Sequence, residues 1–122
     1  MPPSPLSRLR KLCLALPESY EKEAWGTPTF RVTKGKIFAM YAGASTHAGD
    51  GRHGVWLNAA SGNQELMLRA APTRFFYPPY VGKGGWIGVF LDARTDWKGL
   101  AGLIEDSWRL SAPKTLIKQR GK

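Results

Sequence analysis

The stretch TFRVTKGKIFAMY, residues 29–41, alternates apolar and polar side chains, turns at KGK, and continues as an apolar run. Phe30 and Val32 alternate with polar residues, which is the two-residue period of a β-strand. Glycine and charged residues between two such runs are typical of a hairpin turn. The stretch therefore predicts an antiparallel hairpin that carries Lys34 and Lys36 at its tip.

Helical patterns flank this hairpin on both sides. Ser4 followed by Pro5 is a helix start, because a hydroxyl caps the first turn and proline fits within it. Leucines at helical spacing continue from there until Pro17 ends the pattern, and from Ser19 to Tyr41 the period changes to that of strands. Near the other end, Thr95 or Asp96 caps a long helix, and Pro113 kinks or restarts it. The predicted buried stripe of that helix is Trp97, Leu100, Ala101, Ile104 and Trp108.

The middle of the chain supplies shorter elements. A loop rich in glycine and small residues, Gly43 to Gly54, precedes a short strand at residues 55–57. Ser61 and Gln64 have the spacing of a capping box ahead of a helix over residues 65–71. An irregular connection over residues 74–85 then leads to a last strand over residues 86–91. We predict one α+β domain, residues 1–122, whose antiparallel sheet packs against helices in the order α-β-β-β-β-α-β-α.

Charge indicates the class of partner. The chain has 18 Lys and Arg against 9 Asp and Glu, which gives a net charge of +9. Such an excess attracts DNA or another polyanion, anionic membranes or acidic proteins, although it can also serve solubility alone. No apolar run reaches the length of a membrane span, and the first residues do not resemble a signal peptide. We therefore expect a cytoplasmic protein with no membrane partner.

The candidate phosphate-binding residues are basic residues at turns and near the C-terminus. Lys34 and Lys36 flank the hairpin turn, and Arg31 precedes them on the exposed strand face. Short basic turns can lie along a phosphate backbone, where each lysine releases counterions. Solvated lysines at turns and a frayed tail are the alternative interpretation. The remaining candidates are Lys83, in the glycine turn of residues 82–85, and Lys114 and Lys118.

Other chemistries receive little support. The glycine turn can form an anion-binding nest or a plain turn with positive φ, and we favour the plain turn. His47, Asp50 and His53 share one loop, but three ligands without a fourth are a weak zinc signal. Cys13 lies among leucines, so a buried inert thiol is expected. No nucleophile, acid and base can be assigned, and we predict neither an enzyme nor a cofactor or metal.

Several separated motifs together resemble one protein family. They are LPE at residues 16–18, WGTPTFRV at 25–32, GKIFA at 35–39, PYVGKGGWIGV at 79–89, and a close from Asp96-Trp97 through EDSWRLSAPK at 105–114. This pattern, from about Leu9 to Leu116, is similar to the MmcQ/YjbR proteins. The resemblance implies a compact α+β fold, likened to type III secretion chaperones and to frataxin-like domains. The loop from Gly43 to Gly54 departs from the family pattern by its length.

The resemblance also implies two competing functions. A "double-wing" mode of DNA binding has been proposed for the family, and no catalytic residue is established in it. The first hypothesis is therefore a non-catalytic DNA-binding module that places hairpin lysines on the phosphate backbone. The second is a protein-interaction or chaperone-like module that uses an exposed aromatic loop. Phe75, Phe76, Tyr77 and Tyr80 are the aromatic residues of that loop.

Overall fold

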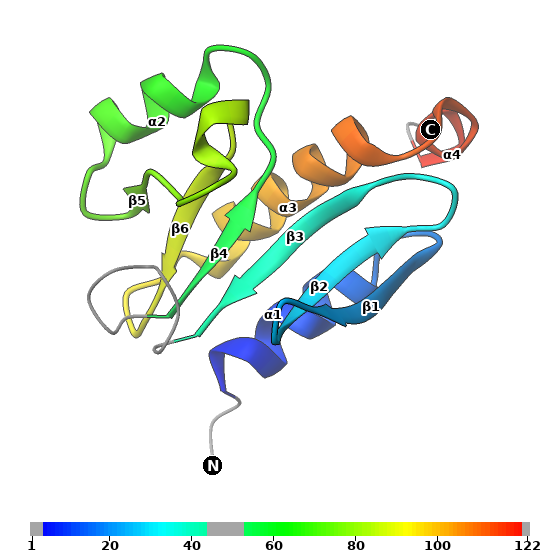
Figure 1. Ribbon diagram of the computed structural model, residues 1–122, viewed down its shortest axis with the longest axis horizontal. Helices are drawn as coiled ribbons and strands as arrows, with labels where there is room; N and C mark the ends of the chain where they lie inside the picture. The colour runs from blue at the N-terminus through cyan, green and yellow to red at the C-terminus, as the bar shows by residue number, and fades with distance from the viewer. Residues whose placement is uncertain (1–3, 44–52, 121–122) are drawn as a thin grey trace.

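A computed structural model describes residues 4–43 and 53–120 of the chain (Figure 1). Its helices are α1 (Pro5–Leu14), α2 (Asn63–Ala70), α3 (Trp97–Ser111) and α4 (Lys114–Arg120), with a short 3-10 turn, η1 (Gly82–Gly84). Its strands are β1 (Ser19–Ala24), β2 (Thr27–Val32), β3 (Ile37–Ala42), β4 (His53–Leu57), β5 (Phe75–Phe76) and β6 (Ile87–Leu91). Within these ranges no helix is long and apolar enough to span a membrane.

The predicted α+β class and element order are confirmed. The structure adds three short elements that the sequence patterns did not resolve, namely β5, η1 and α4. The first two fall within the segment that we expected to be irregular. The third begins directly after Pro113, so this proline restarts the helix instead of kinking it.

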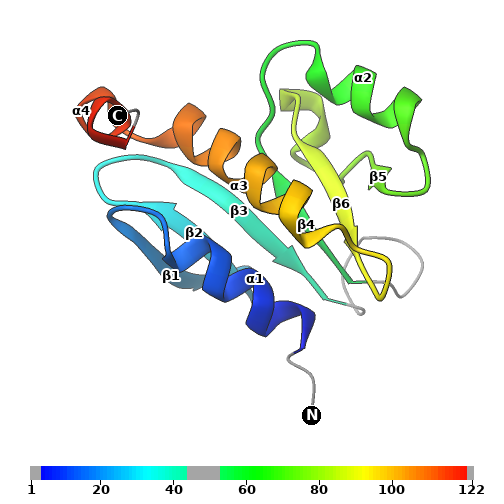
Figure 2. The same ribbon diagram turned by 180° about the vertical axis from the view of Figure 1, so that it is seen from behind.

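All six strands form one antiparallel sheet, in the order β1-β2-β3-β4-β6-β5. Helices α1 and α3 lie across the same face of this sheet (Figure 2). We call this the helix face and the opposite side the open face. Between Phe30 and Arg31 the β2–β3 register shifts, so two consecutive residues of β3, Phe38 and Ala39, both join the core on the helix face.

The main core fills the space between the sheet and the two helices. Ser4 Oγ accepts a hydrogen bond from the Ser7 amide at 3.1 Å, which confirms the predicted start of α1. Three members of the predicted α3 stripe are buried, whereas Trp97 and Ala101 are half-buried. The largest fully buried side chains of this core are Trp108, Phe30, Phe38, Leu9, Leu57, Ile87, Leu100 and Ile104.

Hydrogen bonds hold α3 in place on the sheet. The buried Ser107 Oγ donates to the carbonyl of Phe38 at 2.5 Å and accepts from the amide of Asn58 at 2.9 Å. One turn later, Ser111 Oγ donates to the carbonyl of Ile37 at 3.3 Å. Because these bonds are directional and lie in a buried or half-buried contact, they fix the position of α3 along β3, which hydrophobic contact alone would leave free to slide.

A smaller apolar cluster lies on the open face. Met40 and Trp56 are its buried centre, and the ring of Phe76 covers two glycines beside them. A Cβ at Gly88 would come within 2.3 Å of that ring, and a Cβ at Gly54 within 3.0 Å. The two glycines therefore make room for β5 to lay an aromatic ring flat on the sheet.

One local prediction is wrong. Ser61 does not cap α2: the helix covers Asn63–Ala70, two residues earlier than the predicted start at residue 65, and its N-cap is Gly62, at φ 87° and with no side-chain cap bond. Gln64, the other half of the expected capping box, turns away from the helix start. Its Nε2 donates to the carbonyls of Gly82 at 2.8 Å and Trp86 at 2.6 Å. The tertiary contact with the glycine turn thus replaces the local cap.

Candidate nucleic-acid interface

The β2–β3 turn is held against the end of α3. Lys34 adopts a φ of 63°, and the amide of Gly35 donates to the carbonyl of Val32 at 2.9 Å, closing the turn. The amide of Lys36 then donates to the carbonyl of Ser111 at 3.2 Å. Both lysine side chains remain exposed. The predicted hairpin tip therefore has a fixed position and presents two cations to solvent.

The second basic turn is equally well held. The side chain of Gln64, on α2, donates hydrogen bonds to the carbonyls of Gly82 and Trp86. Gly85 has the positive φ, 93°, that a plain turn requires. The amides of Gly82, Gly84 and Gly85 all donate to carbonyls within residues 78–82. With those donors already used, the turn cannot act as an anion-binding nest. Lys83 is exposed on it.

The two turns border the same hollow on the open face, which we call the basic hollow. Its volume is about 530 Å³. Gly35 and Lys36 line it from the hairpin, and Gly84, next to Lys83, lines it from the glycine turn. No carboxylate belongs to the set of lining residues, which is Tyr20, Arg31, Gly35, Lys36, Ile37, Asn58, Gly84, Trp86 and Ser111.

Arg31 and Tyr20 form the part of the hollow that lies on the sheet. The two residues are directly paired across β1 and β2, so their side chains share one face. Arg31 Nε donates to Thr29 Oγ1 at 3.2 Å, which orients the guanidinium along the strand. No carboxylate forms an ion pair with Arg31 in the part of the chain that the structure describes.

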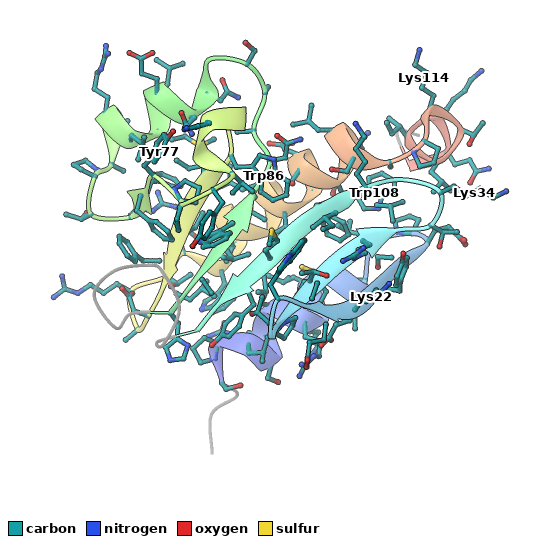
Figure 3. All side chains as sticks on the ribbon, viewed as in Figure 1. Lys22, Lys34, Tyr77, Trp86, Trp108 and Lys114 are labelled. Carbon is teal, nitrogen blue, oxygen red and sulfur yellow. The ribbon has the colours of Figure 1, made fainter. Side chains whose placement is uncertain are left out.

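The C-terminal candidates lie beyond one end of the hollow. Lys114 and Lys118 are exposed on α4, and Figure 3 shows Lys34 and Lys114 extending outward at the same end of the molecule. A Cβ at Gly35 would lie 3.4 Å from Pro113 Cδ, which confirms that the hairpin tip and the start of α4 are close. The structure therefore brings Arg31, Lys36 and the glycine turn together and sets Lys34, Lys114 and Lys118 on their flank.

Sequence reasoning missed the aromatic and amide residues of the lining, which are Tyr20, Asn58 and Trp86. Tyr20 had a usable signal, because Tyr20 and Lys22 alternate with Glu21 and Glu23 at strand spacing. The acids of this alternation lie on the other face: Glu21 faces α1, where it accepts two hydrogen bonds from Arg10, at 2.6 and 2.9 Å. Asn58 and Trp86 gave no local signal.

The aromatic loop divides into two halves. Phe75 is buried in the main core, and Phe76 lies on the open face, where the centres of its ring and the Phe90 ring are 4.6 Å apart. Tyr77 and Tyr80, in contrast, are 54% and 77% exposed. Only the second half of the loop is therefore available as a contact surface.

The other candidate chemistries remain without a site. Tyr41 Oη and His53 Nδ1 form a hydrogen bond, but His47 and Asp50 lie outside the described residues. Across residues 4–43 and 53–120 no three metal-ligating side chains come together. Burial raises the pKa of the Cys13 thiol far above its usual value, as expected for an inert core cysteine.

Comparisons with known proteins agree with this fold. The solved structure of protein DR2400 from Deinococcus radiodurans, described as a DUF419 domain, is similar with a TM-score of 0.70. It is 23% identical, and the match covers 88% of this chain and 80% of that one. No curated protein matches the sequence. The family model named YjbR matches residues 14–110, most of the described fold, and the chain therefore belongs to the YjbR family.

Proposed function

We propose that the protein binds DNA through the basic hollow and its flanking lysines, without catalysing a reaction on it. The observation that supports this most directly is that two basic turns, far apart in sequence, border one hollow with no carboxylate in its lining. A surface of that kind attracts phosphates, because no carboxylate among the lining residues offsets Arg31 and Lys36. The net charge of +9 adds long-range attraction.

The arrangement suits contact with a nucleic-acid backbone. Lys34 and Lys83 stand on turns whose backbones are held by bonds to Ser111 and Gln64, at the two sides of the hollow. Lysines on such fixed turns meet phosphates as point charges and release counterions on binding. Contacts of this type position a duplex without reading its bases, so we expect low sequence specificity.

The test is a fluorescence-anisotropy titration of a labelled DNA duplex at low and at near-physiological salt, with heparin as competitor. The double variant Lys36→Glu/Lys83→Glu should bind far more weakly than the wild type. Neutralising each phosphate contact should also lower the salt slope of log K by about 1. Lys11→Glu/Lys98→Glu is the matched control, because it changes the net charge by the same amount at two exposed lysines that lie on α1 and α3, on the helix face.

Two results would contradict the proposal. One is wild-type binding that disappears at near-physiological salt, which would make the charge incidental. The other is an equal loss of affinity in the hollow variant and in the Lys11→Glu/Lys98→Glu control, which would show a response to net charge alone. Circular dichroism of each variant verifies that the fold is retained.

Exposed aromatic residues support a second candidate function, a protein-interaction module. Besides Tyr77 and Tyr80, Leu66 on α2 is exposed, at 63%. Exposed apolar groups of this size are typical of protein contacts when they are contiguous. Sedimentation velocity tests self-association through this surface. A concentration-dependent dimer that Leu66→Glu dissociates would favour a protein-interaction module over DNA binding.

A further inference from the structure

The basic hollow carries features that a duplex backbone does not need. Besides cations, it is lined by two aromatic residues, Tyr20 and Trp86, and by Asn58. Tyr20 is 43% exposed although it lies on a regular strand. Aromatic rings beside cations are the usual components of a surface on which nucleobases stack.

The polar groups of the hollow are suited to the rest of a nucleotide. Asn58 Oδ1 accepts the amide hydrogen of Ala59 at 2.9 Å, which leaves its NH₂ group without a hydrogen-bond partner among the described residues. Such an amide can donate to a carbonyl or ring nitrogen of a base. Arg31 and Lys36 line the same space and carry the charge that a phosphate requires.

Size agrees with this assignment. A volume of about 530 Å³ lies within the range of roughly 300–1,000 Å³ that is usual for small-ligand sites, so the hollow can hold one nucleotide. A base within a duplex cannot reach an aromatic ring in a hollow, since both of its faces are stacked on neighbours. An unpaired base has free faces and needs no such disruption.

We infer that the basic hollow binds an unpaired nucleobase together with its phosphate, so that single-stranded nucleic acid is the preferred ligand. The base stacks on Tyr20 and Trp86, while Arg31 and Lys36 contact the phosphate. This inference rests on the proposed function, because it assigns a substrate class to the same surface. A base in a strand and a free nucleotide share this chemistry, and the experiment separates them.

The experiment compares a labelled 12-nucleotide single strand with the duplex of the same sequence, by anisotropy at one salt concentration. The single strand should bind more tightly, and Tyr20→Thr should weaken its binding about tenfold. Threonine keeps the strand propensity of β1, and Trp86→Phe is a second variant that retains an apolar ring in the open-face cluster. Trp25→Asn is the control, because it removes an exposed aromatic residue at the far end of β1.

Competition identifies the source of the base. Millimolar AMP should displace the strand, whereas inorganic phosphate at the same concentration should not. A strand that binds much more tightly than AMP confirms single-stranded nucleic acid as the ligand, and equal affinities would overturn that assignment in favour of a free nucleotide.

The possible failures are distinguishable. If duplex and single strand bind equally, Tyr20→Thr has no effect and Lys36→Glu/Lys83→Glu still weakens both, the base site is wrong and backbone binding stands. If neither ligand binds at near-physiological salt, both proposals are overturned.

Discussion

The amide of Lys36 donates a hydrogen bond to the carbonyl oxygen of Ser111 at 3.2 Å, across 75 positions of the chain. This bond joins the tip of the β2–β3 hairpin to the last turn of α3. The carbonyl of Ser111 belongs to a helix end, where such oxygens lack an intrahelical donor. The hairpin tip therefore satisfies a group that the helix cannot satisfy, and this contact brings the lysines of the hairpin close to those of α4, which follows α3.

Gly35 leaves no room for a side chain at this contact. A Cβ there would lie 2.5 Å from the Ser111 carbonyl oxygen, which is backbone and cannot turn aside. We expect Gly35→Ala to lower the free energy of unfolding by about 2 kcal/mol. Urea denaturation measures this, with Gly84→Ala as control, because a Cβ at Gly84 would meet nothing within 4 Å. Equal stability of the two variants would contradict the close packing of the tip.

A substitution in the β1–β2 turn should increase the stability of the protein. Its two central residues, Trp25 and Gly26, both have positive φ, 54° and 75°, as in a type I′ turn. Asparagine adopts this conformation more readily than tryptophan, and Asn-Gly is the preferred pair. Trp25 is 77% exposed, so little burial is lost on replacement. Trp25→Asn should therefore raise stability by about 1 kcal/mol, visible as a higher Tm; a lower Tm would show that the indole makes a stabilising contact.

The two residues expected to cap helices, Asp96 and Ser61, should differ in their contribution to the stability of the protein. Asp96 Oδ1 accepts a hydrogen bond from the Gly99 amide at 3.0 Å, whereas Ser61 makes no cap bond to α2. Asp96→Ala should cost about 1 kcal/mol of stability. Ser61→Ala should change it by less than about 0.5 kcal/mol. Thermal denaturation of both variants checks the difference, and a larger loss for Ser61→Ala would restore the capping box.

Cys13 should be unreactive in the folded protein. A disulfide reagent at pH 8 is expected to modify it only after urea is added, because the native thiol is buried and its pKa is raised by desolvation. Rapid modification of the native protein would contradict this burial.

The same shift predicts a pH dependence of stability. The folded state keeps the Cys13 proton above the pH at which the unfolded thiol, with a pKa of about 8.5, releases it. Its contribution is therefore fully present below that pH and is lost as pH rises above it. Between pH 7 and pH 10 the wild type should lose about 2 kcal/mol more stability than Cys13→Ala in urea titrations. Parallel losses in the two proteins would rule out this linkage.

Local sequence patterns were sufficient to predict the main helices and strands. They were not sufficient to predict β5, η1 and α4 or the residues of the site. The alternation of Phe30 and Val32 and the helical spacing of Leu100, Ile104 and Trp108 identified the core faces, because burial follows the period of each element. The Ser61 cap was wrong because Gln64 has partners on another segment. Tyr20 was missed because its strand is charged on the helix face as well, where Glu21 pairs with Arg10.

The amino-acid order alone was enough to establish the α+β class, one helix start at Ser4 and another at Thr95 or Asp96, and the excess of positive charge. The class and the helix starts depend on residues that are close together in the sequence, and the charge depends on composition alone. Which basic residues border one hollow is decided by the tertiary structure. Lys36 and Gly84 line the same hollow because of sheet pairing and because of the bonds to Ser111 and Gln64. Contacts between residues so far apart depend on the packing of the whole domain, and no local pattern encodes them.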